Sequence, residues 1–362
     1  MNKIFKVIWS KSKQCYVVVS EMAKNKTGKK KIVVASILAA LAMQTAGVID
    51  VAAAAGDQPS AAIADGTVTS GKTNGLAIGN ASNSGSNQSI AIGYFSEATA
   101  PEVTPAALPA TAVGAGAKAI GYSTVALGLS AQAKADSATA LGSKTSATGD
   151  RSVAVGINAA ATADSATALG SKTSATGDRT VAVGSDAKAT GRYASTFGAD
   201  ASAVGNATAV GANSLASVDA AVAVGTDSKA TGNYASALGA GATASDNEST
   251  AFGHGTVASG SSSTALGSRA KAGGVAGVGI GMLANATNQY GVAIGGESSS
   301  SADNSIAIGR KSSVTGENGI AIGTFTTSKG ANGVAVGTNG TTAELGGVAV
   351  GQAAKSNKFN SV

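Results

Sequence analysis

The sequence contains few charged, aromatic, proline and sulfur-containing residues. Only 13% of its 362 residues are charged and 4% are aromatic, and the one cysteine and one tryptophan, Cys15 and Trp9, lie near the N-terminus. Such low charge excludes a solvated disordered chain, and a single cysteine excludes a disulfide framework. The 50 glycines follow no three-residue period, which excludes collagen. The scarcity of large side chains also argues against one domain with a thick core.

The net charge of +6 comes from the N-terminal segment. Residues 1–55 hold nine of the 26 basic residues and two of the 20 acidic ones, so that 17 basic and 18 acidic residues remain for the rest of the chain. That remainder has no basic block. The charge distribution therefore predicts no nucleic-acid partner.

Residues 1–55 are predicted to be an extended signal peptide. Residues 1–31 are basic, residues 32–43 form an apolar run, and small residues follow as far as Ala55. This order is typical of a secretory signal, with cleavage expected near Ala55. An uncleaved membrane anchor over residues 32–49 is the alternative, because that stretch is about long enough for one span. Residues 56–74 are predicted to be a lead-in segment.

An internal repeat predicts the fold of the remaining chain. A motif of the form x-Ala-aliphatic-Gly, with the variants STFG, TAFG and VGIG, recurs twenty times, and its glycine returns every 14 residues except for a step of 21 after Gly93 and a step of 13 after Gly198. This period is too short for paired helices or propeller blades. It fits one coil of a parallel β-solenoid with two short strands and two tight turns.

The alternation of side chains within the motif predicts that the chain associates with other copies of itself. In a strand such as residues 152–155, Val153 and Val155 point to one face, whereas Ser152 and Ala154 point to the other. Neither face is charged, which suggests that both are buried. A single thin coil encloses only one of them, so the other face requires another chain. We therefore expect a homo-oligomer with cyclic symmetry, whose number of chains the spacing does not determine.

The motif resembles a known family. NSIAIG at 304–309, with QSIAIG at 88–93 and NGIAIG at 318–323, is similar to the head repeat of YadA-like trimeric autotransporter adhesins. Residues 1–24 resemble the extended signal peptide region of large type V secreted proteins of Gram-negative bacteria. The resemblance implies an all-β fold, a left-handed parallel β-roll or solenoid of 14-residue coils over residues 75–355, and a homotrimeric head displayed on the outer membrane.

Two parts of the chain depart from the family pattern. Residues 94–113 break the period and contain Pro101, Pro105 and Pro109. They are predicted to be a loop inserted in the roll, because proline cannot donate to a strand ladder. Family members also continue into a stalk and a C-terminal membrane anchor, and the sequence shows no heptads or terminal amphipathic strands. Residues 356–362 are therefore predicted to be the start of a neck or a truncated end.

The resemblance also implies a ligand-binding role for the NSIAIG stretch, since such motifs are tied to collagen binding in the family. The candidate residues are Asn304, Ser305, Ile306, Ala307, Ile308 and Gly309. Packing is the alternative, and it is favoured because the roll must bury these aliphatic and alanine side chains.

Other polar and aromatic residues give weaker signals. His254 has no second histidine or cysteine after the leader, so that no metal site is predicted. No phosphate-binding GxxxxGK[ST] motif occurs, and no catalytic residue, cofactor or small-molecule substrate is predicted. Tyrosines at one repeat position could contact a ligand or pack between coils, and packing is favoured: Tyr193, Tyr234 and Tyr290. Charged residues at another repeat position are expected to lie close together, with Lys172 paired to Asp186: Lys144, Lys172, Asp186, Asp200 and Asp227.

The sequence therefore predicts a non-enzymatic surface adhesin that contributes to virulence. Its expected partners are host matrix proteins of the collagen, fibronectin or laminin class, host cells, and other copies of the chain in autoaggregation. A structural spacer that presents another adhesive domain is the main alternative. The period of 14 and the unpartnered His254 oppose a hexapeptide-type acyltransferase. The lack of GGxGxD turns or a regular threonine ladder opposes a calcium-dependent or ice-binding solenoid.

Overall fold

The computed structural model describes residues 5–10, 15–20, 61–63, 67–68, 74–100, 109–342 and 345–362. The chain divides into two units, Met1–Ile49 and Asp50–Val362. In the first unit, β1 (Phe5–Ser10) and β2 (Cys15–Ser20) form an antiparallel pair. The predicted apolar run at 32–43, the alternative anchor over 32–49 and the cleavage position near Ala55 lie outside the described residues.

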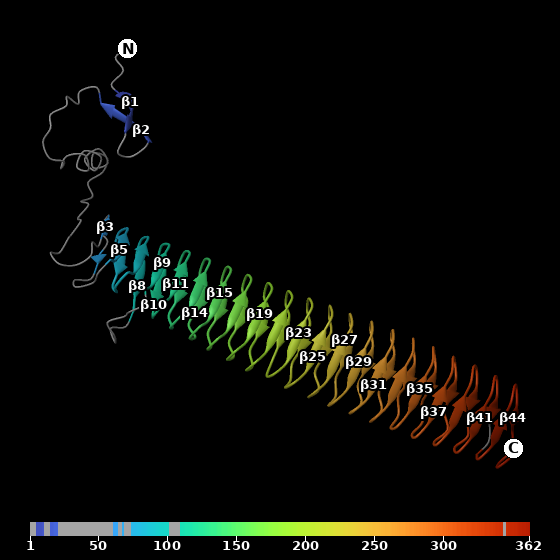
Figure 1. Cartoon of the computed structure of the whole chain (residues 1–362). Coiled ribbons are helices and arrows are strands. Elements are labelled where there is room, and N and C mark those ends of the chain that lie inside the picture. The colour runs from blue at the N-terminus through green and yellow to red at the C-terminus, as the bar shows by residue number, and fades with distance from the viewer. Residues whose placement is uncertain are drawn as a thin grey trace. The chain divides into compact units, whose positions relative to one another are not determined.

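The second unit is a β-solenoid whose coils stack along one axis (Figure 1). Each coil contributes one strand to each of two parallel ladders, which we call the odd ladder and the even ladder after the strand numbers. Each strand pairs with the strand one coil earlier and the strand one coil later, so that Val153 of one coil faces Thr167 of the next. The predicted parallel β-solenoid is confirmed, and the left-handed sense of its coils stays a prediction.

The odd ladder is formed by β3 (Ala61–Ile63), β5 (Leu76–Ile78), β7 (Ile90–Ile92), β9 (Thr111–Val113), β11 (Val125–Leu127), β13 (Thr139–Leu141), β15 (Val153–Val155), β17 (Thr167–Leu169), β19 (Val181–Val183), β21 (Ser195–Phe197), β23 (Thr208–Val210), β25 (Val222–Val224), β27 (Ser236–Leu238), β29 (Thr250–Phe252), β31 (Thr264–Leu266), β33 (Val278–Ile280), β35 (Val292–Ile294), β37 (Ile306–Ile308), β39 (Ile320–Ile322), β41 (Val334–Val336) and β43 (Val348–Val350).

The even ladder is formed by β4 (Thr67–Val68), β6 (Asn83–Ser84), β8 (Glu97–Thr99), β10 (Lys118–Ile120), β12 (Gln132–Ala133), β14 (Ser146–Ala147), β16 (Ala160–Ala161), β18 (Ser174–Ala175), β20 (Lys188–Ala189), β22 (Ser202–Ala203), β24 (Leu215–Ala216), β26 (Lys229–Ala230), β28 (Thr243–Ala244), β30 (Val257–Ala258), β32 (Lys271–Ala272), β34 (Asn285–Ala286), β36 (Ser299–Ser300), β38 (Ser313–Val314), β40 (Thr327–Ser328), β42 (Thr341–Thr342) and β44 (Lys355–Ser356).

Two tight turns close each coil. Turn 1 runs from an odd strand to the next even strand, and turn 2 runs from an even strand to the next odd strand. Each turn has a residue with φ near 55°, for example Lys144 (φ 55°) in turn 1 and Arg151 (φ 56°) in turn 2, and turn 1 also opens on a glycine with positive φ. The glycine that opens turn 1 is required both for its positive φ and because the next coil leaves no space for a side chain. At Gly225 (φ 130°), an added Cβ would lie 2.6 Å from the carbonyl carbon and oxygen of Gly239 in the next coil.

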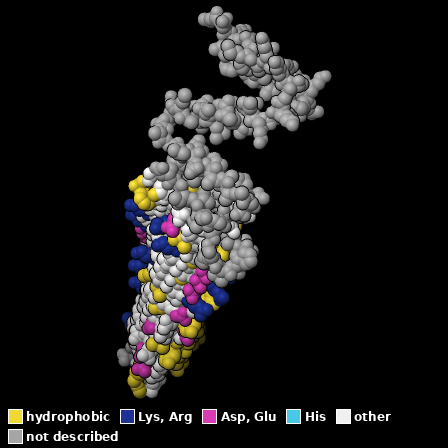
Figure 2. Space-filling model, turned by 90° about the vertical axis from the view of Figure 1, so that its left-hand side faces the viewer, with side chains coloured by type: hydrophobic (Ala, Val, Ile, Leu, Met, Phe, Trp, Pro, Cys, Tyr) yellow, Lys and Arg dark blue, Asp and Glu magenta, His cyan; other side chains and the backbone are white. Residues whose placement is uncertain are grey.

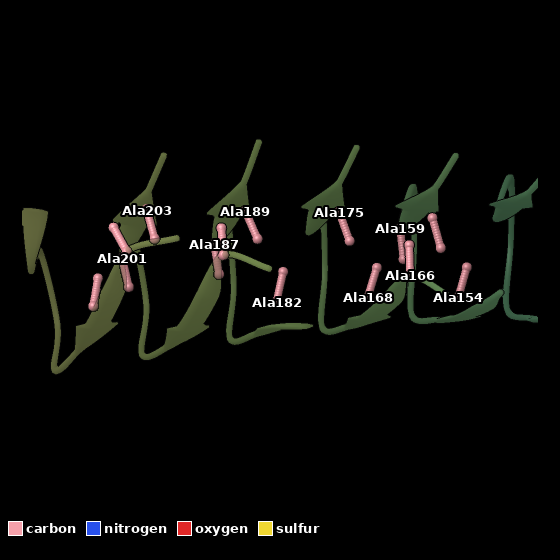
Figure 3. Packing of buried hydrophobic residues seen from close by; sticks show 14 of the residues in the cluster. Ala154, Ala159, Ala166, Ala168, Ala175, Ala182, Ala187, Ala189, Ala201 and Ala203 are labelled. Atoms are coloured by element: carbon pink, nitrogen blue, oxygen red, sulfur yellow. The ribbon is translucent and has the colours of Figure 1, made fainter. Parts of the chain in front are cut away.

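The interior between the two ladders is lined by small side chains. In one coil, Ser152, Ala154, Ala159 and Ala161 all have zero exposure. Figure 3 shows alanines of the odd ladder pointing toward alanines of the even ladder across the interior. Buried hydroxyls are satisfied locally, as when Thr145 Oγ1 donates to the Gly142 carbonyl oxygen at 2.9 Å. Alanine therefore faces inward, and the aliphatic face of each odd strand is the outer face.

The ladders begin before the predicted start at residue 75. β3 pairs with β5 and β4 pairs with β6, so that part of the predicted lead-in segment 56–74 already belongs to the solenoid. In this coil the sequence after Ile63 has Ala64 where later coils have the motif glycine, which is why the repeat pattern did not include it.

The predicted insertion at 94–113 is narrower than that range. β8 pairs with β6 and β10, and β9 pairs with β7 and β11, so that both ends of the range are ladder strands. Their side chains alternate between outside and inside as in other coils. Residues 101–108, which include Pro101 and Pro105, lie outside the described residues.

The solenoid continues as far as position 361, and the expectation of a neck or a truncated end at residues 356–362 stays a prediction. Val348 N–H donates to the Ser361 carbonyl oxygen at 2.7 Å, as Val334 N–H donates to Gly347 at 2.8 Å one coil earlier. The β44 strand likewise extends to Ser356.

Candidate functional site

The outer face of the odd ladder is the largest candidate site in the described solenoid. Each odd strand turns its first and third residues outward and buries the residue between them. No charged residue occupies either outward position. The third position holds a large apolar residue in every strand from β5 to β43: Ile78, Ile92, Val113, Leu127, Leu141, Val155, Leu169, Val183, Phe197, Val210, Val224, Leu238, Phe252, Leu266, Ile280, Ile294, Ile308, Ile322, Val336 and Val350.

These outer side chains remain partly accessible to solvent in the single chain. Leu127 is 38% exposed, Phe252 is 51% exposed and Ile322 is 39% exposed. At a strand spacing of about 4.8 Å, the face extends over about 90 Å. Soluble monomers rarely expose apolar patches larger than a few hundred Å². The face is therefore suited to contact with another protein surface.

The outer face of the even ladder has a different character. Its strands present one outward residue followed by a buried one, and five of these outward residues are exposed lysines: Lys118, Lys188, Lys229, Lys271 and Lys355. Lys118 is paired with Glu97 at 3.3 Å. Figure 2 shows dark blue side chains along one margin of the visible face and a stripe of hydrophobic side chains along the other. The even face is thus suited to solvent.

The residues of the NSIAIG stretch divide between the interior and the surface. Ser305 and Ala307 have zero exposure, and Ser305 Oγ donates to the Ala302 carbonyl oxygen at 2.6 Å. Ile306 and Ile308 lie half-buried on the outer face of β37. Asn304 is exposed in turn 2, with φ 54°. A ligand could therefore contact only the surface side chains of this stretch, Asn304, Ile306 and Ile308. The predicted binding role of the stretch stays a prediction.

Turn 1 carries a column of charged side chains along one edge of the solenoid. The column contains Lys144, Lys172, Asp186, Asp200 and Asp227, each at φ between 55° and 57°. Their backbones stack in register, as when Lys172 N–H donates to the Ile157 carbonyl oxygen at 2.8 Å. Within the described solenoid the recorded ion pairs are Lys118–Glu97 and Lys311–Glu297, and the expected pair between Lys172 and Asp186 is not among them.

Turn 2 forms the opposite edge and carries the three tyrosines singled out from the sequence. Tyr193, Tyr234 and Tyr290 are 42%, 65% and 57% exposed. Tyr193 contacts two cations, because the Arg179 and Arg192 guanidinium carbons lie 5.5 Å and 5.0 Å from its ring centre. Arg179 Nη1 also donates to the Tyr193 hydroxyl at 2.7 Å. The tyrosines therefore belong to the surface of the single chain, and Tyr193 packs against its neighbours there.

Carboxylates in turn 2 bind backbone N–H groups of the preceding coil. Asp136 Oδ1 accepts from Tyr122 N–H at 2.9 Å, and Asp219 Oδ1 accepts from Asn206 N–H at 3.1 Å and from Asn206 Nδ2 at 2.7 Å. The hydrogen bonds from Asn206 hold the pKa of the Asp219 carboxyl below its ordinary value. Asn206 lies in turn 2 of the coil that has 13 residues instead of 14. The hydrogen bonds to Asp219 therefore join this shorter turn to the next coil.

Sequence reasoning did not identify these contacts between coils. The relevant signal was present, because Arg179 and Tyr193 are separated by one period of 14 residues and so lie side by side on successive turns. The same separation joins Tyr122 to Asp136. Pairing each turn residue with the residue one period later would have found both.

The described residues contain neither a cluster of metal ligands nor a membrane-spanning helix. No group of three or more histidine, cysteine, aspartate or glutamate side chains lies close enough to hold a metal ion there. His254 belongs to turn 1, where its carbonyl oxygen accepts from Arg269 N–H at 2.9 Å. None of the described residues forms a helix with the length and hydrophobicity that a membrane span requires.

Comparison with known proteins gives two family matches. Residues 1–48 match a family model described as the extended signal peptide of the type V secretion system. A second model, described as the YadA head domain repeat, matches ten segments that together cover more than half of the chain: 71–96, 109–128, 119–145, 147–173, 175–206, 205–228, 230–256, 258–281, 286–312 and 315–339.

Other comparisons contribute less. No curated protein matches the chain. Among solved structures, the chain is similar to the collagen-binding domain of the Yersinia adhesin YadA, with 27% sequence identity over 52% of this chain and 80% of that one. The TM-score of 0.21 is too low for this superposition to carry an argument.

Proposed function

Because this chain belongs to the family of YadA-like trimeric autotransporter adhesins, we propose that it forms the head of a bacterial surface adhesin in which three copies pack together. The outer face of the odd ladder is the contact surface between copies. The head is exported by type V secretion and displayed on the outer membrane of a Gram-negative cell.

The observation that carries the proposal is the uncharged, aliphatic outer face of the odd ladder. It extends from β5 to β43 without a charged residue, and the interior of the coil is already filled by alanine. Coils of parallel copies at the same height repeat the same contact along the whole axis. A cyclic arrangement buries the face of every copy, and the family supplies the number three.

The proposed partners of the head are matrix proteins of the collagen, fibronectin or laminin class, host cells and other heads in autoaggregation. Such a head needs no catalytic group, because its work is to hold contacts. Three copies displayed together bind a repeating matrix fibre more tightly than one, since the first contact raises the effective concentration of the others. The exposed Asn304 belongs to the proposed ligand-contacting surface, whereas the buried Ser305 and Ala307 support it from inside.

The association is tested by analytical ultracentrifugation of the full chain at micromolar concentration. We expect a trimer, and a folded monomer would contradict the proposed packing. The adhesive role is tested on the same preparation by solid-phase binding to collagen, fibronectin and laminin, with cell clumping measured in parallel. Saturable binding to at least one matrix protein, or clumping, is the expected result.

A structural spacer is the second candidate, and the uniformity of the coils favours it. The even ladder presents mostly isolated polar side chains with the same spacing from coil to coil, which suits a rod that holds another domain away from the cell. A trimer that neither binds the three matrix proteins nor clumps cells would support the spacer over the adhesive head.

A further inference from the structure

One coil of the solenoid is shorter than the others at turn 2. The coil that follows Gly198 has 13 residues and lies between β21 and β23, near the middle of the solenoid (Figure 1). In the neighbouring coils the turn 2 residue with positive φ carries a side chain, as Tyr193 and Tyr234 do. In the short coil that residue is Gly205 (φ 67°), and in the next coil it is Ala220. Two successive coils therefore lack a large side chain at this position.

Two exposed tyrosines border this short turn. Tyr193 belongs to the coil before it and Tyr234 to the second coil after it, so that three strand spacings place them about 14 Å apart along the axis. Arg179 and Arg192 hold the Tyr193 ring through cation–π contacts, and Arg179 also donates to its hydroxyl. The Tyr234 ring is 65% exposed. The stretch thus has apolar ring surface at both of its ends.

Between the tyrosines, an amide and a carboxylate hold each other in fixed positions. Asp219 Oδ1 accepts from both Asn206 N–H and Asn206 Nδ2, and both side chains are exposed. This arrangement leaves acceptor capacity on Asp219 Oδ2 and Asn206 Oδ1, and it leaves the second N–H of Asn206 Nδ2 as a donor. A ligand would meet polar groups that are oriented before it binds, which lowers the entropic cost of binding.

The charges around this stretch balance each other. In the five coils from Gly170 to Gly239, turn 2 carries two arginines, Arg179 and Arg192, and two aspartates, Asp178 and Asp219. Such a mixture offers complementary potential to neither a polyanion nor a polycation. It suits a neutral ligand whose groups both donate and accept hydrogen bonds.

A short neutral oligosaccharide has this chemistry. The C–H face of a hexopyranose packs against an aromatic face, whose negative charge attracts the weakly positive C–H groups. Each sugar hydroxyl donates one hydrogen bond and accepts others, which matches the acceptors and the donor of Asn206 and Asp219. Because apolar atoms make contact at about 4 Å, one sugar ring does not reach both tyrosines. The ligand therefore contains more than one ring.

A proline-rich or triple-helical peptide is a less suitable ligand for the same stretch. Proline also stacks on tyrosine. Its backbone, however, has no N–H group, so that such a peptide presents mostly carbonyl acceptors. These do not pair with the carboxylate of Asp219, which needs a donor.

We propose that the turn 2 surface from Tyr193 to Tyr234 binds a neutral oligosaccharide of hexopyranose units. Tyr234 is the main platform, Asn206 and Asp219 bind hydroxyls, and Tyr193 contacts a second ring. This site goes beyond the proposed binding of matrix proteins, and the contact between copies is no part of it. Several copies in one head would bind a glycan-covered surface more tightly than one.

Titration by saturation-transfer NMR tests the site on the full chain. The probes are lactose, N-acetyllactosamine and chitotriose, each at millimolar concentration. We expect saturable transfer to the C–H protons of at least one of these sugars. A heparin tetrasaccharide and a triple-helical peptide of Pro-Pro-Gly repeats are tested in parallel. Absence of transfer to all three sugars, or binding of heparin or the peptide alone, would overturn the proposal.

Three variants test the named residues. Tyr234→Ala removes the platform and is expected to weaken sugar binding at least about tenfold, whereas Tyr234→Phe keeps the ring and should stay within about threefold of wild type. Insertion of one arginine after Asn206 restores a coil of 14 residues, with arginine at the position that Arg151 and Arg179 occupy in their coils. It is expected to weaken binding as much as Tyr234→Ala, because its long side chain fills the space between the tyrosines. Circular dichroism checks the fold of each variant, and unchanged binding by a folded Tyr234→Ala chain would contradict the site.

Tyr290→Ala is the matched control. Tyr290 occupies the same position of turn 2, is 57% exposed and lies beside a carboxylate, Asp303, that accepts from Asn288 Nδ2. Its own coil and both neighbouring coils have 14 residues, and the nearest tyrosine in turn 2 is four coils away. A ligand there meets one ring instead of two, so that Tyr290→Ala should leave sugar binding unchanged. A loss equal to that of Tyr234→Ala would show that the short coil does not define the site.

Ultracentrifugation of the same variants separates this proposal from the proposed head. Tyr234→Ala is expected to leave the concentration for half-dissociation of the trimer unchanged. Weaker association would show that Tyr234 contacts another copy instead of a sugar, which would overturn the present proposal. A wild-type monomer that binds the sugars contradicts the trimer alone. A trimer that binds matrix proteins but none of the sugars contradicts the oligosaccharide site alone.

Discussion

The odd and even ladders differ most on their outer faces. Both turn small side chains inward, as with Ala182 of β19 and Ala189 of β20, and both form parallel ladders with one strand per coil. Outside, the odd ladder presents a large apolar residue at the end of every strand from β5 to β43, whereas the even ladder presents mostly polar residues, among them five lysines, with isolated apolar ones such as Leu215 and Val257. The interior therefore explains why the coil forms. The outward residues determine which side of it is covered by another copy.

The strongest test of this difference places a charge on each face in turn. Leu169→Asp on the odd ladder buries a carboxylate in the proposed contact in all three copies. It is expected to destabilise the trimer by about 3 kcal/mol or more. Leu215→Asp, the same replacement on the outer face of the even ladder, is expected to leave the trimer intact. Analytical ultracentrifugation of both variants measures the fraction of trimer. Equal dissociation of the two variants would contradict the claim that only the odd ladder is a contact surface.

A second test examines the interior, where the two ladders are equivalent. Ala182→Leu and Ala189→Leu each force a larger side chain between the ladders, since both alanines have zero exposure. Each is expected to lower the free energy of unfolding by about 2–3 kcal/mol, measured by denaturant unfolding of the full chain. Val257→Leu, on the outer face of β30 in the even ladder, serves as the control and should change it little. Tolerance of leucine at either alanine would contradict the filled interior.

The turn that joins the two faces gives a third, smaller effect. Gly225→Ala is expected to destabilise the solenoid by about 1–3 kcal/mol, because its φ of 130° is unfavourable for alanine and the new Cβ meets the backbone of Gly239. Gly241 is also in turn 1, but at φ 66° and with open space around it. Gly241→Asn should therefore be close to neutral. Thermal unfolding of the two variants provides the comparison.

The smallest expected effect is on the loss of thermal stability at low pH. The pKa of Asp219 is lowered in the folded chain by hydrogen bonds from Asn206, so its contribution to stability is present above the unfolded value of about 3.9 and is lost as pH falls through the folded pKa. Wild type should therefore lose slightly more thermal stability than Asp219→Asn between about pH 5 and pH 2. Equal slopes for the two proteins would show that Asp219 does not contribute.

The sequence predicted the coil because the motif contains both features that a coil requires, a strand with two distinct faces and a tight turn. Strand alternation in segments such as 152–155 separated two faces, and the recurring glycine marked the tight turn. The first coil was not predicted, since Ala64 replaces that glycine. Which face lies inside was also open, because neither is charged. The structure places the alanine side inside, where alanine, serine and threonine predominate and Val314 is the largest fully buried side chain.

The candidate site was predictable only in part. That one face would remain uncovered followed from the thinness of the coil, and the structure identifies it as the aliphatic face. The roles of individual surface residues did not follow in the same way. Two contacts depend on the stacking of turns in successive coils: the one between Arg179 and Tyr193, and the hydrogen bond from Asn206 N–H to the Asp219 carboxylate.

The central claim is that other copies cover the odd ladder and leave the even ladder in solvent. Hydroxyl-radical footprinting of the full chain measures this residue by residue. All three leucines chosen for the comparison are half-buried in the single chain. The account predicts that Leu169 and Leu238 on the odd ladder are strongly protected from oxidation, whereas Leu215 on the even ladder is oxidised at the rate expected of a half-buried leucine. Equal labelling of all three in the folded protein would contradict it.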